Sequence, residues 1–216
     1  MSNNGYTVRE NLVELKESIL EDLSQGYDLV DVAYSSDGTW VGTFQDTPGL
    51  SSYITASNTD ELGQTVQEQW TQGYRLTDVE YGDGVWFGTL QEGSKANAYN
   101  FVSSLNELTE GIAGRWEEGY DLVDVEYGDG TWFGVFQDDS SITSGYNIAS
   151  SFDELAEGIS ERWGEGYELV DVEYGDGIWF GTVEKQTDTA FHDSYLDSFL
   201  KLTEISLEPD FLLKDF

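Results

Sequence analysis

One arrangement of hydrophobic and polar positions occurs four times along the chain. In its third copy Leu108, Ile112 and Trp116 follow one another at intervals of four, with mostly polar or small residues between them. This spacing places the three side chains on one face of a helix. After Gly119 the apolar residues alternate with a period of two, which is typical of a strand. The pattern therefore predicts a helix followed by a strand in every copy.

Residues with capping preferences mark both ends of each expected helix. A polar residue suited to the N-cap is followed three residues later by a glutamate, and Ser104 with Glu107 and Ser151 with Glu154 form capping boxes. A glycine stands where each helix should end, because glycine adopts the left-handed conformation there at little cost. These glycines are Gly26, Gly73, Gly119 and Gly166.

Short β-like runs flank each expected helix. One run led by a tyrosine precedes the helix, and two follow it, separated by a turn that contains Asp-Gly. Such a turn between two alternating runs is a strong signal for an antiparallel hairpin. In the third copy we expect Val123 and Val125 to share one strand face, and Leu122 and Asp124 to share the other. Each copy is thus predicted to be strand–helix–strand–strand.

The copies recur every 46 or 47 residues, a period typical of repeat proteins. The expected fold class is α+β, with antiparallel hairpins packed in a closed pseudo-symmetric array, because one unit alone buries too little apolar surface. Residues 1–186 form this domain, and 187–216 form an apolar helical tail that docks on the repeats or engages another chain. The units span residues 6–46, 53–92, 99–138 and 146–186.

The charge of the chain restricts its partners. Forty-three acidic residues against nine basic ones give a formal net charge of −34. Nucleic acids and anionic membranes are polyanions, so we expect neither to bind directly. Three explanations of the acidity remain: a surface adapted to high salt, a protein partner with a basic surface, or mimicry of DNA.

No residue pattern indicates catalysis, a metal site or a cofactor. The chain has no cysteine, and its one histidine is His192, so neither thiol chemistry nor a typical zinc site is expected. Four aspartates recur in the strands, and they either bond a neighbouring unit's backbone, lie exposed, or ring a central opening that binds a cation such as Ca²⁺. They are Asp31, Asp78, Asp124 and Asp171.

The sequence also predicts a cytoplasmic location. The N-terminal residues lack the basic and apolar runs of a secretion signal, and no stretch is long enough to span a membrane.

Aromatic residues supply the candidate partner-binding positions. Trp70, Trp116 and Trp163 end the helical stripes and are expected in the core. Four other tryptophans follow the hairpin turns, and either lie in the core or form an aromatic binding surface. With the apolar residues of the tail, the candidate set is Trp40, Trp86, Trp132, Trp179, Phe191, Tyr195, Phe199, Phe211, Leu212 and Phe216.

The order of residues within the unit resembles a known repeat. A helix ending in Trp is followed by Gly-Tyr, a strand, a short turn, and a second strand led by Trp, in residues 70–89, 116–135 and 163–182, with a weaker copy at 23–43. This order is similar to a repeat of uncharacterised bacterial proteins and to the region C-terminal to the kinase domain in plant casein-kinase-I-like proteins. The resemblance covers nearly all of residues 1–186 and implies a non-catalytic interaction module, without supplying functional residues.

We therefore predict a non-enzymatic protein-binding, adaptor or regulatory module that uses the repeat surface and the tail. One alternative is an acidic DNA mimic that inhibits a nucleic-acid-binding or defence protein. Another is a small-ligand or calcium sensor with a pocket at the pseudo-symmetry axis. A homo-oligomer assembled through the tail is also compatible with the sequence.

Overall fold

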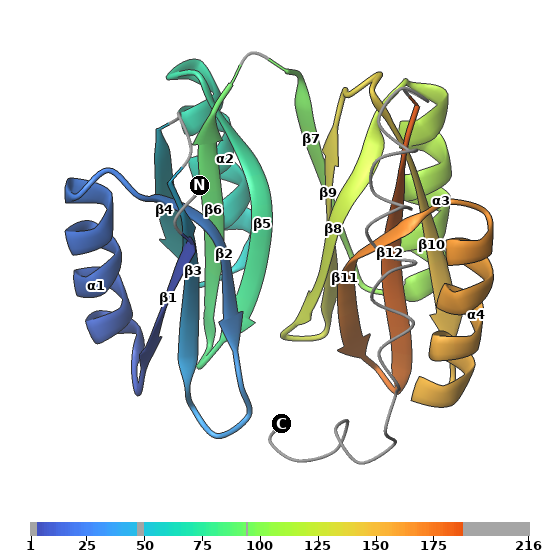
Figure 1. Ribbon diagram of the computed structural model, residues 1–216, viewed down its shortest axis with the longest axis horizontal. Helices are drawn as coiled ribbons and strands as arrows, with labels where there is room; N and C mark the ends of the chain where they lie inside the picture. Colours follow the sequence, from blue (N-terminus) through green and yellow to red (C-terminus); the bar gives the residue numbers. More distant parts are fainter. Residues whose placement is uncertain (1–3, 47–49, 94, 188–216) are drawn as a thin grey trace, which may run out of the picture.

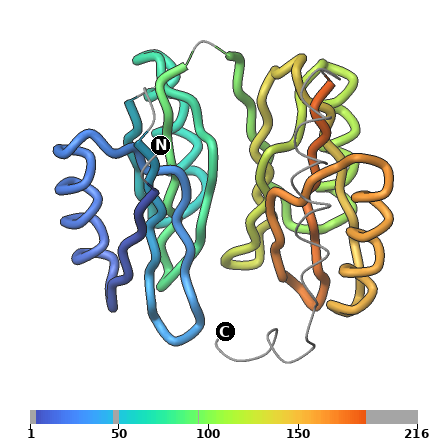
Figure 2. Tube along the Cα trace, viewed as in Figure 1, coloured from blue at the N-terminus to red at the C-terminus, as the bar shows by residue number. Residues whose placement is uncertain are grey.

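The described part of the protein consists of four similar α+β units, and the predicted helical tail, apart from Thr187, lies outside the described residues. The computed structural model describes residues 4–46, 50–93 and 95–187 (Figures 1 and 2). The first unit contains β1 (Asn4–Arg9), α1 (Leu12–Ser24), β2 (Asp28–Tyr34) and β3 (Trp40–Gln45). The second contains β4 (Ser51–Ala56), α2 (Thr59–Thr71), β5 (Tyr74–Gly82) and β6 (Val85–Glu92). The third contains β7 (Asn97–Val102), α3 (Leu105–Glu117), β8 (Asp121–Gly128) and β9 (Thr131–Gln137). The fourth contains β10 (Ile142–Ala149), α4 (Phe152–Gly164), β11 (Glu168–Gly175) and β12 (Ile178–Gln186). The predicted strand–helix–strand–strand repeat is confirmed.

Every unit has the same antiparallel sheet, with its last strand in the middle. The strand orders are β1-β3-β2, β4-β6-β5, β7-β9-β8 and β10-β12-β11. The helix packs on one face of its own sheet, and two aliphatic residues of each expected stripe are buried there. These pairs are Leu15 and Ile19, Leu62 and Val66, Leu108 and Ile112, and Leu155 and Ile159.

The helix ends and hairpin turns follow the expected chemistry. The glycine after each helix has φ between 86° and 89°, in the left-handed region that glycine tolerates. In the last three hairpins an aspartate with φ of 50° or 51° precedes a glycine with φ between 75° and 78°. Two successive positive φ values define the type I′ turn, whose twist matches that of the flanking strands.

A β-bulge corrects the predicted faces of the strand after each helix. The register shifts between Leu122 and Asp124 in β8, and at the equivalent place in the other three units. The extra residue, Val123, breaks the alternation, so Leu122 and Val125 both enter the core under α3. Simple alternation predicted that Leu122 and Asp124 share one face of the strand, and this prediction was wrong.

The four sheets meet through the strand that follows each helix, here called the inner strand of the unit. β2 contacts β5, β5 contacts β8, and β8 contacts β11. In Figure 1 these strands lie toward the middle of the molecule, with α1 and α4 at its outer sides. A phenylalanine of the following unit completes the core at each contact: Phe87 in the first unit, Phe133 in the second and Phe180 in the third. The units are therefore joined in series by three similar junctions.

Candidate functional site

Seven carboxyl side chains gather where the inner strands meet. They form two sets along these strands: Asp31, Asp78, Asp124 and Asp171 in one, and Glu80, Glu126 and Glu173 in the other. Members of each set interact electrostatically with carboxyls from several units, so the cluster belongs to the whole array rather than to one repeat.

These carboxyls bond the backbone of the preceding unit. Val79 donates its amide hydrogen to Asp124 Oδ2 at 2.9 Å, and Tyr81 donates to Glu126 Oε1 at 3.0 Å. The same bonds recur at the first junction, from Val32 to Asp78 and from Tyr34 to Glu80, and at the third, from Val125 to Asp171 and from Tyr127 to Glu173. In each of β2, β5 and β8, two edge amides are therefore bonded by carboxyl side chains of the next unit instead of by another strand.

Burial and mutual repulsion raise the pKa of the cluster. Burial, then the like charges of Asp78, Glu173 and Asp31, raise the pKa of Glu80 to about 9. Burial is also the main cause that raises the pKa of Asp171 and of Glu173 to about 7. The pKa values of Asp78, Asp124 and Glu126 lie well above the usual range for the same reasons. The cluster can therefore hold protons at neutral pH.

The contacts observed for this cluster are with backbone amides and among its own carboxyls. In the residues that the structure describes, no group of three or more His, Cys, Asp or Glu side chains is arranged to hold a metal ion. The expectation that each recurring aspartate bonds a neighbouring unit's backbone is met by Asp78, Asp124 and Asp171. Asp31 has no preceding unit, and it shares a hydrogen bond with Asp78 instead.

A tyrosine ring packed on a glycine is a second element of every junction. Tyr81 lies on Gly128 so closely that a Cβ atom there would overlap the ring. Tyr34 lies on Gly82 and Tyr127 on Gly175 in the same way. Glycine is required because the ring of one unit contacts the backbone of the next directly.

A polar residue at the start of each unit forms a third element. Asn97 Oδ1 accepts the indole N–H of Trp70 at 3.0 Å and the amide of Leu76 at 2.9 Å. Ser144 Oγ accepts from Trp116 at 2.9 Å and from Leu122 at 2.8 Å. We call this residue the clasp residue. Ser51 is the clasp residue of the first junction, where it accepts from the amide of Leu29.

The positions of the tryptophans agree with the predictions only in part. Trp40, Trp86 and Trp132 are buried in the cores, and Trp179 is half-buried, so the first three cannot form an exposed binding surface. The helix-end tryptophans were expected in the core, but they lie at the junctions. Trp70 is half-buried there, Trp116 is 38 % exposed, and Trp163, beyond which no described unit follows, is 57 % exposed. The remaining candidates, Phe191, Tyr195, Phe199, Phe211, Leu212 and Phe216, lie outside the described residues.

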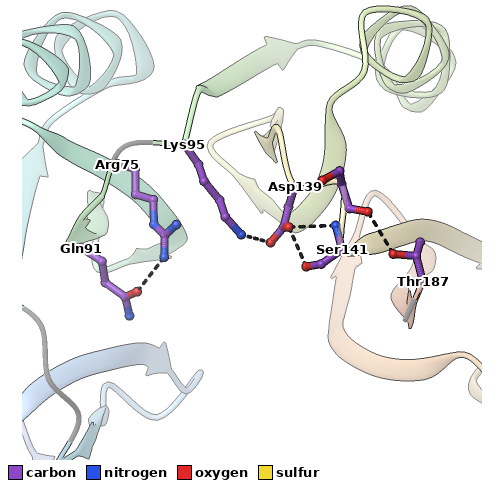
Figure 3. Close-up of polar contacts among 7 residues, drawn as sticks. Arg75, Gln91, Lys95, Asp139, Ser141 and Thr187 are labelled. Atoms are coloured by element: carbon purple, nitrogen blue, oxygen red, sulfur yellow. Dashed lines mark hydrogen bonds and ion pairs between the residues drawn. The ribbon is translucent and has the colours of Figure 1, made fainter. Parts of the chain in front are cut away.

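The loops between units are also linked to one another. Lys95, which precedes β7, pairs with Asp139, which precedes β10 (Figure 3). Asp139 also accepts hydrogen bonds from the amide and hydroxyl of Ser141, and Thr187 donates from its hydroxyl to the carbonyl of Ser140 at 2.9 Å. The third and fourth units are thus held together at this edge by polar contacts.

Within residues 4–46, 50–93 and 95–187, the first and fourth units each have one face that no other unit covers. Tyr6 is 77 % exposed, although its counterparts Tyr53, Tyr99 and Tyr146 are all half-buried at junctions. At the centre of the array the aspartates of all four units interact electrostatically. In the described part of the chain Tyr6 and Trp163 do not complete a fourth junction, because both remain exposed.

Two comparisons with known proteins gave no relative. No protein-family model matches the chain, and no curated protein matches it at a significant level. None of the helices in the described residues combines the length and the apolar character that a membrane crossing needs.

The sequence contains a signal for the junctions that we did not recognise in it. The last three units carry Asp-Val-Glu-Tyr-Gly, whereas the first carries Asp31-Val32-Ala33-Tyr34-Ser35. The glutamate accepts a hydrogen bond from the preceding unit, and the glycine contacts a tyrosine ring of the preceding unit. The first described unit has no preceding unit, and it lacks both residues. Comparing the copies position by position would have identified both residues as junction residues.

Proposed function

We propose that the protein is a non-catalytic protein-binding module whose partner contacts the free face of the first unit. The observation that carries this proposal is the exposure of Tyr6, at a position where the other three units bury a tyrosine against a neighbour. A large exposed aromatic side chain is the kind of residue that dominates the energy of protein interfaces.

The junctions indicate the chemistry that this face would recognise. Tyr99 packs on Trp70 with ring centroids 5.6 Å apart, and Tyr146 stacks on Trp116 at 5.7 Å. Asn4 stands two residues before Tyr6, at the position of the clasp residues Asn97 and Ser144. A partner would therefore present an apolar or aromatic side chain to Tyr6 and an N–H donor to Asn4.

A shallow hollow beside Tyr6 offers room for such a contact. It has a volume of about 270 Å³ and is lined by Asn4, Gly5, Tyr6, Thr43, Phe44 and Gln45. Its lining contains no ionisable carboxyl, so it supplies no acid–base pair for catalysis. The net charge of −34 favours a partner whose surface around the contact is basic, because opposite charges accelerate encounter.

The position of the recurring carboxyls lends no support to the DNA-mimic alternative. A mimic needs carboxylates in rows on an exposed face, whereas the seven of the central cluster bond backbone amides or one another between units. Protein binding therefore remains the function that the geometry favours.

The proposal is tested by affinity capture with the full-length protein and three variants. Tyr6→Ala and Asn4→Ala alter the free face, and Val13→Ala, an exposed residue of α1, is the matched control. We expect a protein that is retained by wild type and by Val13→Ala, and whose affinity measured with the purified partner falls about tenfold or more with Tyr6→Ala. Capture that is indifferent to Tyr6 and Asn4, or no capture at all, would overturn the proposal.

A further inference from the structure

The fourth unit carries a complete junction face that nothing covers in the described residues. Leu29, Leu76 and Leu122 are fully buried in units that another described unit follows, but their counterpart Leu169, which no described unit follows, is 36 % exposed. Trp163 is exposed beside it, at the position where Trp70 and Trp116 bond a clasp residue. The fourth unit has Trp163, Leu169 and Tyr174 at the positions that face the following unit in a junction. The outer face of the first unit, by contrast, has Ala33 and Ser35 in place of the junction glutamate and glycine.

At each junction the cover comes from the chain that directly follows the unit. It begins with a polar clasp residue, then a small residue, then a tyrosine. This triplet opens every unit, and the sequence contains a fifth copy in the tail. The five copies are Asn4-Gly5-Tyr6, Ser51-Ser52-Tyr53, Asn97-Ala98-Tyr99, Ser144-Gly145-Tyr146 and Asp193-Ser194-Tyr195.

The spacing of the fifth copy agrees with the structure of the fourth unit. The clasp residues follow one another at intervals of 47, 46, 47 and finally 49 residues. The sheet of the fourth unit is longer than that of the third. In the third unit the last backbone bond of this kind runs from the amide of Asp138 to the carbonyl of Ala96. In the fourth unit it runs from the amide of Thr187 to the carbonyl of Ser141 at 2.8 Å, and Thr187 lies two residues beyond the position equivalent to Asp138. From that last bond, six residues lead to Ser144 in the third unit and six lead to Asp193 in the fourth. The two additional residues are therefore accounted for by the longer sheet.

We propose that the segment 193–195 of the tail docks on the exposed face of the fourth unit, in the same chain, as the start of an incomplete fifth repeat. The Asp193 carboxylate accepts from the indole N–H of Trp163 and the amide of Leu169, as Asn97 does from Trp70 and Leu76. Tyr195 packs on Trp163, as Tyr146 packs on Trp116. Covalent attachment at Thr187 keeps the segment at a high effective concentration beside this face.

This docking assigns different roles to the two ends of the array. The tail covers the fourth unit, whereas Tyr6 on the first unit remains 77 % exposed in the part of the chain that the structure describes. The inference does not depend on the function proposed for the first unit, since the two surfaces share no residue.

Disulfide trapping in the full-length protein tests the inference directly, because the chain has no cysteine of its own. At the third junction the amide and hydroxyl of Ser144 both bond Asp121 Oδ1, at 2.8 and 3.0 Å, so these two side chains are adjacent. The equivalent pair in the proposed contact is Asp193 with Glu168. We would compare Asp193→Cys/Glu168→Cys with Ser144→Cys/Asp121→Cys as the reference pair, and with Asp193→Cys/Leu20→Cys as the distant control.

We expect an intramolecular disulfide in the Asp193→Cys/Glu168→Cys protein and in the reference pair, but not in the distant control. A disulfide-linked dimer would show that a second chain occupies the face and would overturn the inference. If the reference pair forms its disulfide but the Asp193→Cys/Glu168→Cys protein does not, the inference would be overturned as well.

Hydrogen exchange supplies a second measurement that needs no cysteine. Asp193→Ala or Tyr195→Ala should accelerate exchange of the Leu169 amide at least tenfold, whereas Asp197→Ala, which removes the same charge from the same tail, should leave it unchanged. Equal exchange in wild type and all three variants would contradict docking of this segment.

Discussion

At the scale of single residues, the Tyr–Gly contacts explain why glycine ends three of the inner strands. Gly82, Gly128 and Gly175 have ordinary strand conformations, so backbone freedom is not the reason for glycine there. The reason is space, because each lies directly under a tyrosine ring of the preceding unit. The first unit has Ser35 at this position, where no ring arrives.

We expect Gly128→Ala to destabilise the protein by about 1–3 kcal/mol, because the added Cβ overlaps Tyr81 and forces the two units apart. The free energy of unfolding in urea measures the effect. Gly114→Ala is the matched control: it lies in α3 with open space around the added methyl group, so it should be neutral or stabilising by about 0.5–1 kcal/mol. Equal stability of the two variants would mean that Tyr81 is not fixed on Gly128.

Residue spacing alone could not place the tryptophans. Helical periodicity shows that Trp116 lies on the same stripe as Leu108 and Ile112, but not whether its own sheet or the next unit covers it. In the structure Tyr146 and Ser144 of the fourth unit cover Trp116. Contacts between repeats depend on how the repeats are arranged, which the pattern within one repeat does not contain.

At the scale of elements, the helix starts combine an expected bond with an unexpected one. The amide of Glu154 donates to the N-cap oxygen of Ser151 at 3.3 Å, as the capping box predicts. The Glu154 carboxylate, however, accepts from the amide and hydroxyl of Ser150, one residue earlier. These bonds lower the pKa of Glu154 below its usual value. The motif therefore ties the incoming strand to the helix as well as capping it.

We expect Glu154→Ala to reduce the free energy of unfolding, because the amide of Ser150 loses its acceptor and the helix loses a favourable charge at its N-terminus. Thermal unfolding at pH 7 and at pH 3 tests this. A carboxyl with a lowered pKa stabilises the fold only when ionised, so the cost should decrease as the pH falls. Glu157→Ala, on the same exposed helix one turn later, is the control; an equal loss there would exclude a capping role.

The sequence predicted the elements well because their signals are local. N-caps, C-terminal glycines and Asp-Gly turns act within a few residues, and the structure confirms each type. The bulge at Val123 was missed because it responds to a distant partner: it turns Asp124 toward the amide of Val79 in another unit. Strict alternation is reliable only where one strand face meets one environment throughout.

At the scale of the whole molecule, the central carboxyl cluster links folding to pH. Between the usual carboxyl pKa and the raised value, the folded state holds protons that the unfolded chain has released. The contribution of the cluster to the stability of the fold is therefore fully present below about pH 4. The part due to Asp171 and Glu173 is lost as the pH rises through about 7, and the part due to Glu80 is lost as it rises through about 9. Each unit of pKa change corresponds to about 1.4 kcal/mol.

We expect the melting temperature to be roughly 10 °C lower at pH 9 than at pH 5, since several kcal/mol are involved and each shifts Tm by about 2–4 °C in a chain of this size. Calorimetry in 0.5 M NaCl measures this while screening repulsion between surface charges. Glu126→Gln should weaken the dependence, because the amide oxygen still accepts from Tyr81 but cannot ionise. A melting temperature that stays constant or rises from pH 5 to pH 9 would contradict a buried, protonated cluster.

The placement of that cluster has a consequence for the solubility of a chain so rich in strands and aromatic residues. Each inner strand stands at the end of its sheet order, with one edge that no strand pairs with. Exposed edges of this kind recruit strands from other molecules and seed fibrils. At the first three units, bulges and carboxyls from the neighbouring unit occupy these edges. The acids that join the repeats thus also occupy the edges of β2, β5 and β8, where a strand from another molecule could otherwise pair.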